Sequence, residues 1–164
     1  MTGHSDVNEA KRRLRREMRE MRRALSDREG LSERLWGHVR ALPEVEVAAP
    51  VKVLDSIPGE PITGPFIEWC RRQGKAVALP EDDPPIDPAL VDVVIVPGLA
   101  FTADGERLGQ GGGWSDRFLP QLRAGCTTVG VGFQAQLVES LPTEPHDVTL
   151  SIVVTDVGIV RRGM

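Results

Sequence analysis

The first part of the chain carries an apolar stripe with the spacing of an α-helix. Apolar side chains recur there at steps of three and four residues, at Ala10, Leu14, Met18, Met21 and Leu25. Because an α-helix turns by about 100° per residue, this spacing places them on one face, which we expect to pack on the rest of the protein. A second helix is predicted to begin at a capping box formed by Ser26 and Glu29 and to end at Pro43. Its apolar positions are Leu31, Leu35, Val39 and Leu42.

From residue 50 the pattern changes to short β-branched runs that alternate with helical stretches. The run from Asp92 to Val96 lacks polar alternation, which is expected of a central strand buried on both faces of a parallel sheet. The alternation predicts a three-layer α/β/α domain with a mainly parallel sheet, preceded by two N-terminal helices. Strands are predicted at 51–54, 76–79, 92–96, 128–133, 150–154 and, at an edge, 157–160, with a helix near 63–73.

The size and composition are those of one globular domain. A length of 164 residues supports one hydrophobic core, so we expect a single domain over 1–164, with the N-terminal helices at 1–43 and the α/β body at 50–160. No apolar run approaches the roughly 18–20 residues that cross a bilayer. Cys70 and Cys126 lie far apart and match no metal spacing, so we expect reduced thiols. With no secretory signal at the N-terminus, these features favour a cytoplasmic monomer.

Positive charge is concentrated in the first helix. Residues 1–23 carry eight lysines and arginines against four acids, although the net charge of the chain is −4. Helical geometry places Lys11, Arg15 and Arg22 along one border of the apolar stripe, where they can reach a neighbouring cleft. Such a helix either grips an anionic ligand or binds nucleic acid, and the acidic body and absence of interleaved aromatic residues disfavour nucleic acid. Four other arginines of this helix are expected to point to solvent: Arg12, Arg16, Arg19 and Arg23.

A glycine loop, residues 105–116, follows the predicted central strand. In a doubly wound sheet, ligands bind beyond the carboxyl ends of the strands, which is where this loop lies. Its glycines leave backbone N–H groups open to a phosphate, and a helix predicted near Trp114 points its positive end at the same place. Arg107 can add a bidentate contact to phosphate oxygens. The four glycines clustered in the middle of this loop are Gly109, Gly111, Gly112 and Gly113.

The residues alone leave other interpretations open. The loop lacks the Gly-Lys-Ser/Thr of a P-loop and the glycine spacing of a dinucleotide fingerprint. A flexible turn explains it equally well, with Asp116 as a first-turn helix acid and Arg107 as a solvated charge. We expect His146 to stabilise a turn, and Trp36 and Trp69 to pack in or beside the core.

Five segments occur in the order seen in one known family. They are Lys11-x-x-Leu14-Arg15 and the segments 59–63, 96–101, 105–119 and 144–148. The chain resembles 5-formyltetrahydrofolate cyclo-ligases, also called methenyltetrahydrofolate synthetases, over nearly its whole length. The resemblance implies that ATP phosphorylates the formyl oxygen of 5-formyltetrahydrofolate, that N10 closes the ring, and that phosphate leaves to give 5,10-methenyltetrahydrofolate.

The resemblance also implies roles for particular residues. The implied partners are ATP and a reduced folate, with Arg107 and Asp116 as catalytic residues, Mg²⁺ held by Asp116, and the folate contacted by Glu60 and Trp114. Positioning and charge neutralisation are what phosphoryl transfer requires, and this residue set suits that chemistry. The implied nucleotide contacts are Lys11, Arg15, Arg107, Leu108, Gly109, Gln110, Gly111, Gly112, Gly113, Trp114 and Ser115.

The chain differs from the family pattern at several positions. Family members usually carry a tyrosine pair directly after the glycines, where this chain has Trp114-Ser115 and no tyrosine anywhere. Gln110 replaces a residue that is often basic or aromatic, and Ser151 replaces an acid near the metal. The segment before Asp92 is also shorter than usual. A second hypothesis therefore stays open, a degenerate paralogue that binds nucleotide without folate turnover and has a binding or regulatory role.

Overall fold

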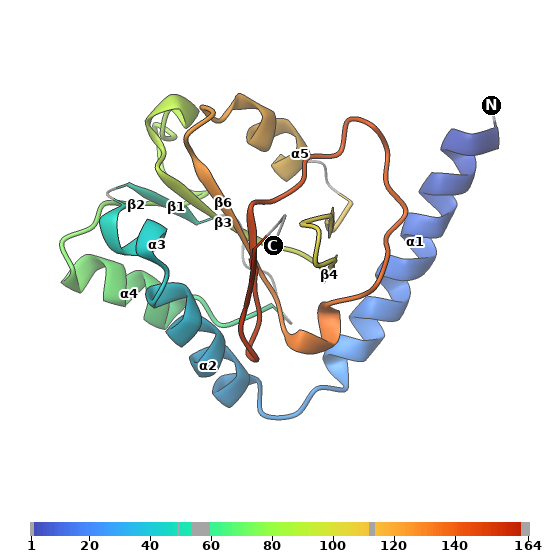
Figure 1. Ribbon diagram of the computed structural model, residues 1–164, viewed down its shortest axis with the longest axis horizontal. Coiled ribbons are helices and arrows are strands. Elements are labelled where there is room, and N and C mark those ends of the chain that lie inside the picture. Colours follow the sequence, from blue (N-terminus) through green and yellow to red (C-terminus); the bar gives the residue numbers. More distant parts are fainter. Residues whose placement is uncertain (1, 49, 54–59, 112–113, 162–164) are drawn as a thin grey trace.

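The computed structural model describes residues 2–48, 50–53, 60–111 and 114–161. At its centre is a six-stranded sheet with the order β2-β1-β3-β6-β7-β8, in which β7 and β8 pair antiparallel and the other neighbours pair in parallel. Helices lie on both sides of this sheet (Figure 1), so the expected α/β/α fold is confirmed. The strands of this sheet are β1 Val51–Val53, β2 Val77–Ala78, β3 Val93–Pro97, β6 Thr127–Val131, β7 Ile152–Val154 and β8 Ile159–Arg161.

The middle strand, β3, is buried along its whole length. It pairs in parallel with β1 on one side and β6 on the other. Val93 and Ile95 belong to the core on one face of the sheet, whereas Val94 and Val96 belong to the core on the other face. This two-sided burial confirms the interpretation of the unbroken apolar run as a central parallel strand.

One face of the sheet is covered by α2 (Arg28–Arg40), α3 (Pro43–Val47) and α4 (Gly64–Arg72). The Trp36 ring stacks on Phe66 with 4.6 Å between ring centroids, and its Nε1 donates a hydrogen bond of 2.6 Å to the Ile62 carbonyl. Trp69 stacks on the same phenyl ring at 5.9 Å and is partly buried. Both tryptophans therefore pack in or beside the core, as expected, and they tie α2 to α4.

The other face is covered by α5 (Trp114–Phe118), the 3₁₀ turn η2 (Leu119–Gln121) and a small antiparallel hairpin. The hairpin pairs β4 (Ala100–Phe101) with β5 (Arg107–Leu108). Phe101 is buried and lies over Gly130 of β6. We did not predict this hairpin, because strands of two residues are too short to show an alternating pattern.

The long helix α1 (Thr2–Arg23) packs on the hairpin rather than on the main sheet. Its apolar stripe contributes Met18, with Leu14 and Met21 partly buried, to a cluster that includes Leu99 and Leu108. In Figure 1, α1 stands on the far side of the molecule from α2, α3 and α4. The prediction that this stripe packs on the body is confirmed, and the hairpin is the surface that receives it.

The start of the second helix differs from the prediction. The N-cap of α2 is Asp27, whose carboxylate accepts a hydrogen bond of 3.2 Å from the Gly30 N–H, so the capping box at Ser26 and Glu29 was wrong. A carboxylate at this position satisfies an N–H group of the first turn as well as a serine would. The helix ends at Arg40, and Pro43 begins α3 instead of only ending α2. Proline suits a first helical position because it lacks the N–H group that would stay unpaired there.

Cys70 and Cys126 are both free thiols, and burial raises the pKa of each to about 11. Within the described ranges, no helix is both long enough and apolar enough to traverse a bilayer.

Gly130→Ala should destabilise the protein by about 1–3 kcal/mol, the usual cost of overpacking a core. A Cβ at this position would lie 2.7 Å from the Phe101 ring and 2.8 Å from the Leu150 side chain. The free energy of unfolding, measured by chemical denaturation, checks this expectation.

Gly37→Ala is the matched control for that substitution. A Cβ at Gly37 in α2 would meet only the Arg40 guanidinium, at 3.9 Å, and alanine favours a helix by about 0.5–1 kcal/mol over glycine. Equal stability of Gly130→Ala and the wild-type protein would contradict the close approach of the hairpin to β6.

Candidate functional site

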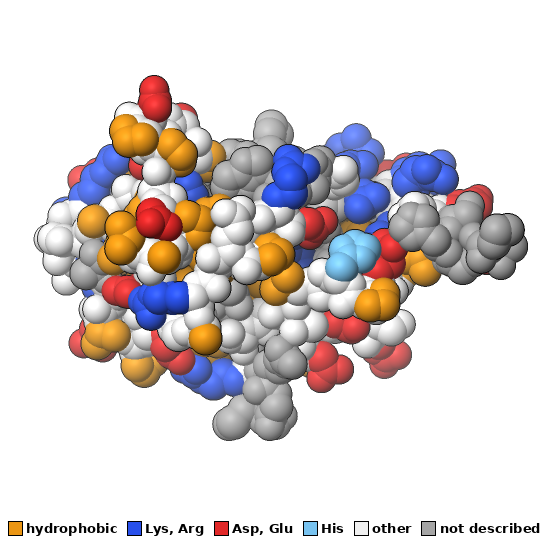
Figure 2. Space-filling model, turned by 90° about the horizontal axis from the view of Figure 1, so that it is seen from above, with side chains coloured by type: hydrophobic (Ala, Val, Ile, Leu, Met, Phe, Trp, Pro, Cys, Tyr) orange, Lys and Arg blue, Asp and Glu red, His pale blue; other side chains and the backbone are white. Residues whose placement is uncertain are grey.

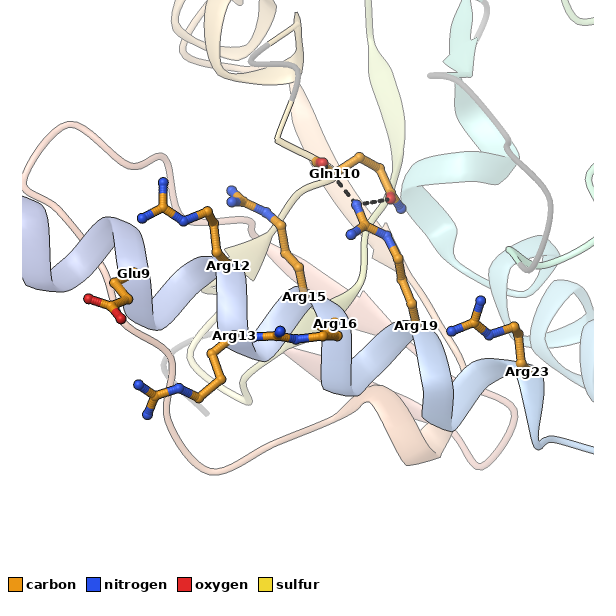
Figure 3. A pocket seen from close by; sticks show the side chains of 8 residues that line it. All are labelled: Glu9, Arg12, Arg13, Arg15, Arg16, Arg19, Arg23 and Gln110. Carbon is orange, nitrogen blue, oxygen red and sulfur yellow. Dashed lines mark hydrogen bonds between the residues drawn. The ribbon is translucent and has the colours of Figure 1, made fainter.

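Side chains of α1 hold the glycine loop in place. The Arg15 Nε donates a hydrogen bond of 2.9 Å to the Gly109 carbonyl. One turn later, Arg19 Nη2 donates to the Gln110 carbonyl at 3.1 Å and to the Gln110 Oε1 at 3.4 Å (Figure 3). The helix and the loop therefore lie side by side. The expectation that Arg19 points to solvent was wrong, because residues four apart share a helix face and the loop covers both.

An arginine groove runs between α1 and the glycine loop. Its volume is about 640 Å³, and Glu9 is the one acid among the described residues that line it (Figure 3). Lys and Arg side chains crowd the same side of the molecule in Figure 2. Such a concentration of one charge attracts anionic ligands. Arg12, Arg16 and Arg23 are exposed, as expected. The groove is lined by Glu9, Arg12, Arg13, Arg15, Arg16, Arg19, Arg23 and Gln110.

Arg107 is packed beneath the glycine loop. Its Nε donates to the Pro97 carbonyl at 2.8 Å, and its Nη2 lies 3.4 Å from the Ser115 hydroxyl. A Cβ at Gly109 would lie 3.1 Å from Arg107 Nη1, so glycine here makes room for the guanidinium. Burial lowers the pKa of Arg107, although the nearby Asp116 and Glu60 oppose this effect. Arg107 is thus a fixed internal cation and not the solvated charge of the alternative interpretation.

The remainder of the loop is described only in part. Gly111 is exposed and has a φ of 104°, whereas Gly112 and Gly113 lie outside the described residues. Trp114 begins α5, but its side chain is outside the described part of the chain. Leu108 is buried in β5 and contributes to the cluster under α1. The prediction of a cradle of open amides can therefore be followed only as far as Gly111.

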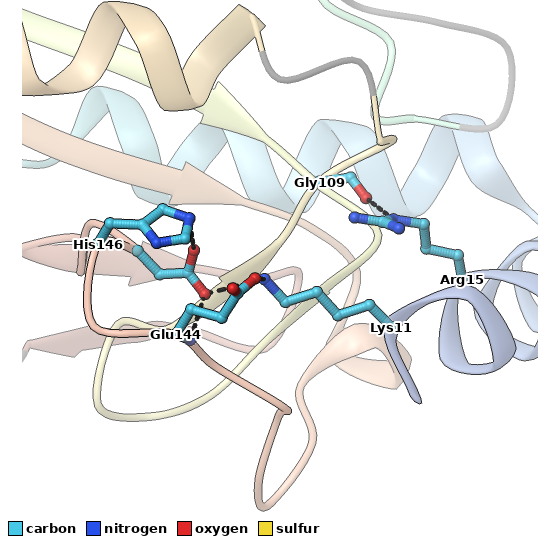
Figure 4. Close-up of polar contacts among 6 residues, drawn as sticks. Lys11, Arg15, Gly109, Glu144 and His146 are labelled. Atoms are coloured by element: carbon cyan, nitrogen blue, oxygen red, sulfur yellow. Dashed lines mark hydrogen bonds and ion pairs between the residues drawn. The ribbon is translucent and has the colours of Figure 1, made fainter. Parts of the chain in front are cut away.

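Lys11 is held by two carboxylates. Its Nζ lies 3.0 Å from Asp147 Oδ2 and 3.3 Å from Glu144 Oε1 (Figure 4). Burial alone would raise the pKa of Asp147, but the Glu144 N–H and Lys11 outweigh it, so that the pKa lies below its usual value. His146 is exposed, with Nε2 3.6 Å from Asp147 Oδ1. Glu144, His146 and Asp147 lie close enough together to hold a metal, but the Lys11 ammonium already takes both carboxylates.

Asp116 is an exposed carboxylate on α5. Its charge acts on both Arg15 and Arg107, which places the three side chains in one neighbourhood. Ser151, at the position where the family resemblance implies a second acid, is exposed and shares a hydrogen bond of 3.2 Å with the Thr128 hydroxyl. Mg²⁺ is commonly bound by one or two carboxylates together with substrate phosphates. A single carboxylate such as Asp116 is enough for this pattern when the metal binds together with a nucleotide.

Glu60 and Arg22 are two buried charged residues that lie within electrostatic reach of each other. Glu60 is 3% exposed, and its carbonyl accepts a hydrogen bond of 3.1 Å from Arg28 Nη2. Arg22, near the end of α1, is 4% exposed. Burial lowers the pKa of Arg22, and Glu60 is the acid that opposes this effect. Sequence reasoning placed Arg22 at a cleft border but missed Arg28, because one arginine at the start of a helix gives no signal.

Comparison with known proteins agrees with this architecture. The family model described as the 5-formyltetrahydrofolate cyclo-ligase family matches residues 7–86 and 84–156. The chain is 32% identical to the 5-formyltetrahydrofolate cyclo-ligase of Escherichia coli K12 over 174 residues, which covers 84% of this chain and 96% of that protein.

Two solved structures are also similar. The 5,10-methenyltetrahydrofolate synthetase of Aquifex aeolicus has a TM-score of 0.82 at 27% identity, covering 94% of this chain and 93% of that one. The synthetase of Mycoplasma pneumoniae has a TM-score of 0.79 at 24% identity, covering 89% and 98%, and supports the fold. The resemblance recognised in the sequence, and the ligase class that it implies, are confirmed. This chain belongs to the 5-formyltetrahydrofolate cyclo-ligase family.

Proposed function

We propose that this protein converts 5-formyltetrahydrofolate to 5,10-methenyltetrahydrofolate with ATP, releasing ADP and phosphate. Family membership supports the reaction. The observation that carries it is the convergence of Arg15, Arg107 and Asp116 at one glycine loop. The formyl oxygen attacks the γ-phosphorus and ADP leaves. N10 then attacks the formyl carbon and loses its proton, and the formyl oxygen departs within the phosphate.

Arg15 and Arg107 are suited to bind the transferring phosphate. Each is anchored to a backbone carbonyl through Nε, at Gly109 and Pro97 respectively. The Arg15 terminal nitrogens and Arg107 Nη1 make no hydrogen bond to a described residue, so they remain for phosphate oxygens. Guanidinium groups oriented in advance lose little freedom on binding and can stabilise charge that develops during transfer.

The arginine groove supplies the rest of the nucleotide site in this proposal. Of the predicted contacts, Gln110 lines this groove, Gly111 follows it in the loop and Ser115 lies on α5, whereas Gly112 and Gly113 are outside the described residues. Arg19 fixes Gln110 through two hydrogen bonds, which supports a preset loop conformation. We propose that Asp116 holds Mg²⁺ with the nucleotide, since a carboxylate oxygen is the donor that this ion prefers. The metal supplies neutralisation of phosphate charge.

Lys11 precedes Arg15 by one turn of α1. Its ammonium is shared by Glu144 and Asp147, so a phosphate oxygen would have to replace one of these carboxylates. We propose that Lys11 makes this exchange when the nucleotide binds. On the folate side, the buried Glu60 is proposed to accept hydrogen bonds from the pterin, and Trp114 to stack on its ring.

A second function, nucleotide binding without folate turnover, is favoured by one observation. Where the family resemblance implies a second acid, the hydroxyls of Ser151 and Thr128 bind each other, so this place offers no carboxylate for a metal.

Incubation with Mg-ATP and 5-formyltetrahydrofolate separates the two functions. We expect the absorbance of the methenyl product to rise in proportion to enzyme concentration, because Arg15 and Arg107 have donors left for the phosphate that the proposed reaction transfers. Retained ATP affinity without product at high enzyme concentration would establish the second function instead.

Arg15→Met should weaken ATP binding by about 10- to 100-fold, since a charge-assisted contact to phosphate is lost. The KM for ATP and a direct ATP titration measure this effect. Arg71→Met removes an exposed arginine on α4 and is expected to change neither quantity. If the two variants behave alike, the phosphate site lies elsewhere.

Asp147→Asn should lower the free energy of unfolding at pH 7 by about 1 kcal/mol, because the ionised carboxylate pairs with Lys11. The folded pKa of Asp147 lies below its usual value, so this stability is present above the unfolded pKa and is lost as the pH falls. The difference in the free energy of unfolding between the variant and the wild-type protein should therefore become smaller as the pH drops below about 4.

Chemical denaturation of Asp147→Asn and of the wild-type protein between neutral and acidic pH measures this difference in the free energy of unfolding. Glu33→Gln neutralises an exposed acid on α2 and serves as the control. A constant difference between Asp147→Asn and the wild-type protein at all pH values would contradict the ion pair.

A further inference from the structure

Arg22 is a buried cation without a hydrogen bond at two of its donors. The side chain is 4% exposed, and neither Nε nor Nη1 has a partner among the described residues. Buried polar groups are almost always hydrogen-bonded, because a buried donor without an acceptor destabilises the fold. A fold that keeps such a group at this cost has donors ready for a ligand.

The surroundings of Arg22 indicate what it would bind. Its neighbours on α1, Arg19 and Arg23, line the arginine groove in Figure 3, whereas Arg22 is absent from that lining and lies within electrostatic reach of Glu60. Arg28 donates to the Glu60 carbonyl and also has an unpartnered Nε. Arg107 also lies within electrostatic reach of Glu60. Donors therefore outnumber acceptors near Glu60, and the unbonded donors of Arg22 and Arg28 can take a further hydrogen-bond acceptor.

The 4-oxopterin ring has a complementary edge. Along this edge, the 2-amino group and N3–H are donors, and the neighbouring O4 is an acceptor. A carboxylate can accept both donated hydrogen bonds, and a guanidinium beside it can donate to O4. Glu60 and Arg22 together offer this set of groups in a buried place, where each hydrogen bond discriminates most strongly.

We propose that Arg22 is a specificity-determining residue that donates a hydrogen bond from Nε or Nη1 to O4 of the pterin while Glu60 binds N3–H and the 2-amino group. The identity of the substrate rests on the proposed function. O4 lies beside N5 on the ring, so this contact also orients the N5-formyl group toward the phosphate site. The pair selects 4-oxopterins over pterins with a 4-amino group, whose N–H donors would face the guanidinium.

The test compares two ligands and three proteins by direct titration without ATP. The ligands are 5-formyltetrahydrofolate and its 4-amino-4-deoxy analogue, and the proteins are the wild type, Arg22→Met and Arg34→Met. We expect the wild type to bind the 4-oxo ligand more tightly than the analogue. Arg22→Met should weaken the binding of the 4-oxo ligand by about 10- to 100-fold and change the affinity for the analogue little. Arg34 is exposed on α2, so Arg34→Met should leave both affinities unchanged.

Each other outcome overturns the inference. If Arg22→Met binds both ligands as the wild type does, water hydrogen-bonds the guanidinium in the wild-type protein. If the variant loses affinity for both ligands equally, the role of Arg22 is structural. Methionine keeps the length of the side chain, and Arg28 and Arg107 still compensate the charge of Glu60 in the variant, so we expect it to fold. The preference between the two ligands can be measured on the wild-type protein alone, and equal affinity of the wild type for both ligands also overturns the inference. If the wild type binds neither ligand, the proposed function fails with it, whereas failure of Arg22→Met alone leaves that function standing.

Discussion

The docking of α1 against the hairpin and the glycine loop is the contact on which the site depends. An apolar cluster around Met18 and Leu108 holds the helix, and Arg15 then reaches the Gly109 carbonyl across 94 positions of sequence. Without this contact the arginines of α1 would be a solvated charged face. With it, they form one wall of a groove whose other wall is the loop.

Several half-buried guanidinium groups of this protein are hydrogen-bonded to backbone carbonyls. Arg15, Arg19, Arg28 and Arg107 each donate to a carbonyl oxygen. Such contacts orient a guanidinium without neutralising it, in contrast with an ion pair to a carboxylate. The charge therefore stays available to an anionic ligand. Lys11 is the exception, since Glu144 and Asp147 already compensate its charge.

Two chemically different sets of groups act on Arg107 or lie near it. One is the exposed Asp116 together with the arginine groove, which suits phosphates and a magnesium ion. The other is Glu60 with Arg22, which are buried and suit a neutral ring with donors and an acceptor on one edge. The proposed transfer of phosphate to a pterin substituent would use both environments.

The sequence by itself determined the architecture, because periodicity and β-branched runs act locally: the stripe at Met18, the central strand at Val93–Pro97 and the packing tryptophans were all predicted. It also indicated Arg15 and Arg107 through their family positions. Only the tertiary structure decided that Lys11 pairs with Asp147, that Arg19 holds Gln110 and that Arg22 is buried beside Glu60. These contacts join residues far apart in the chain, and the charge of a side chain does not specify which partner the packing brings to it.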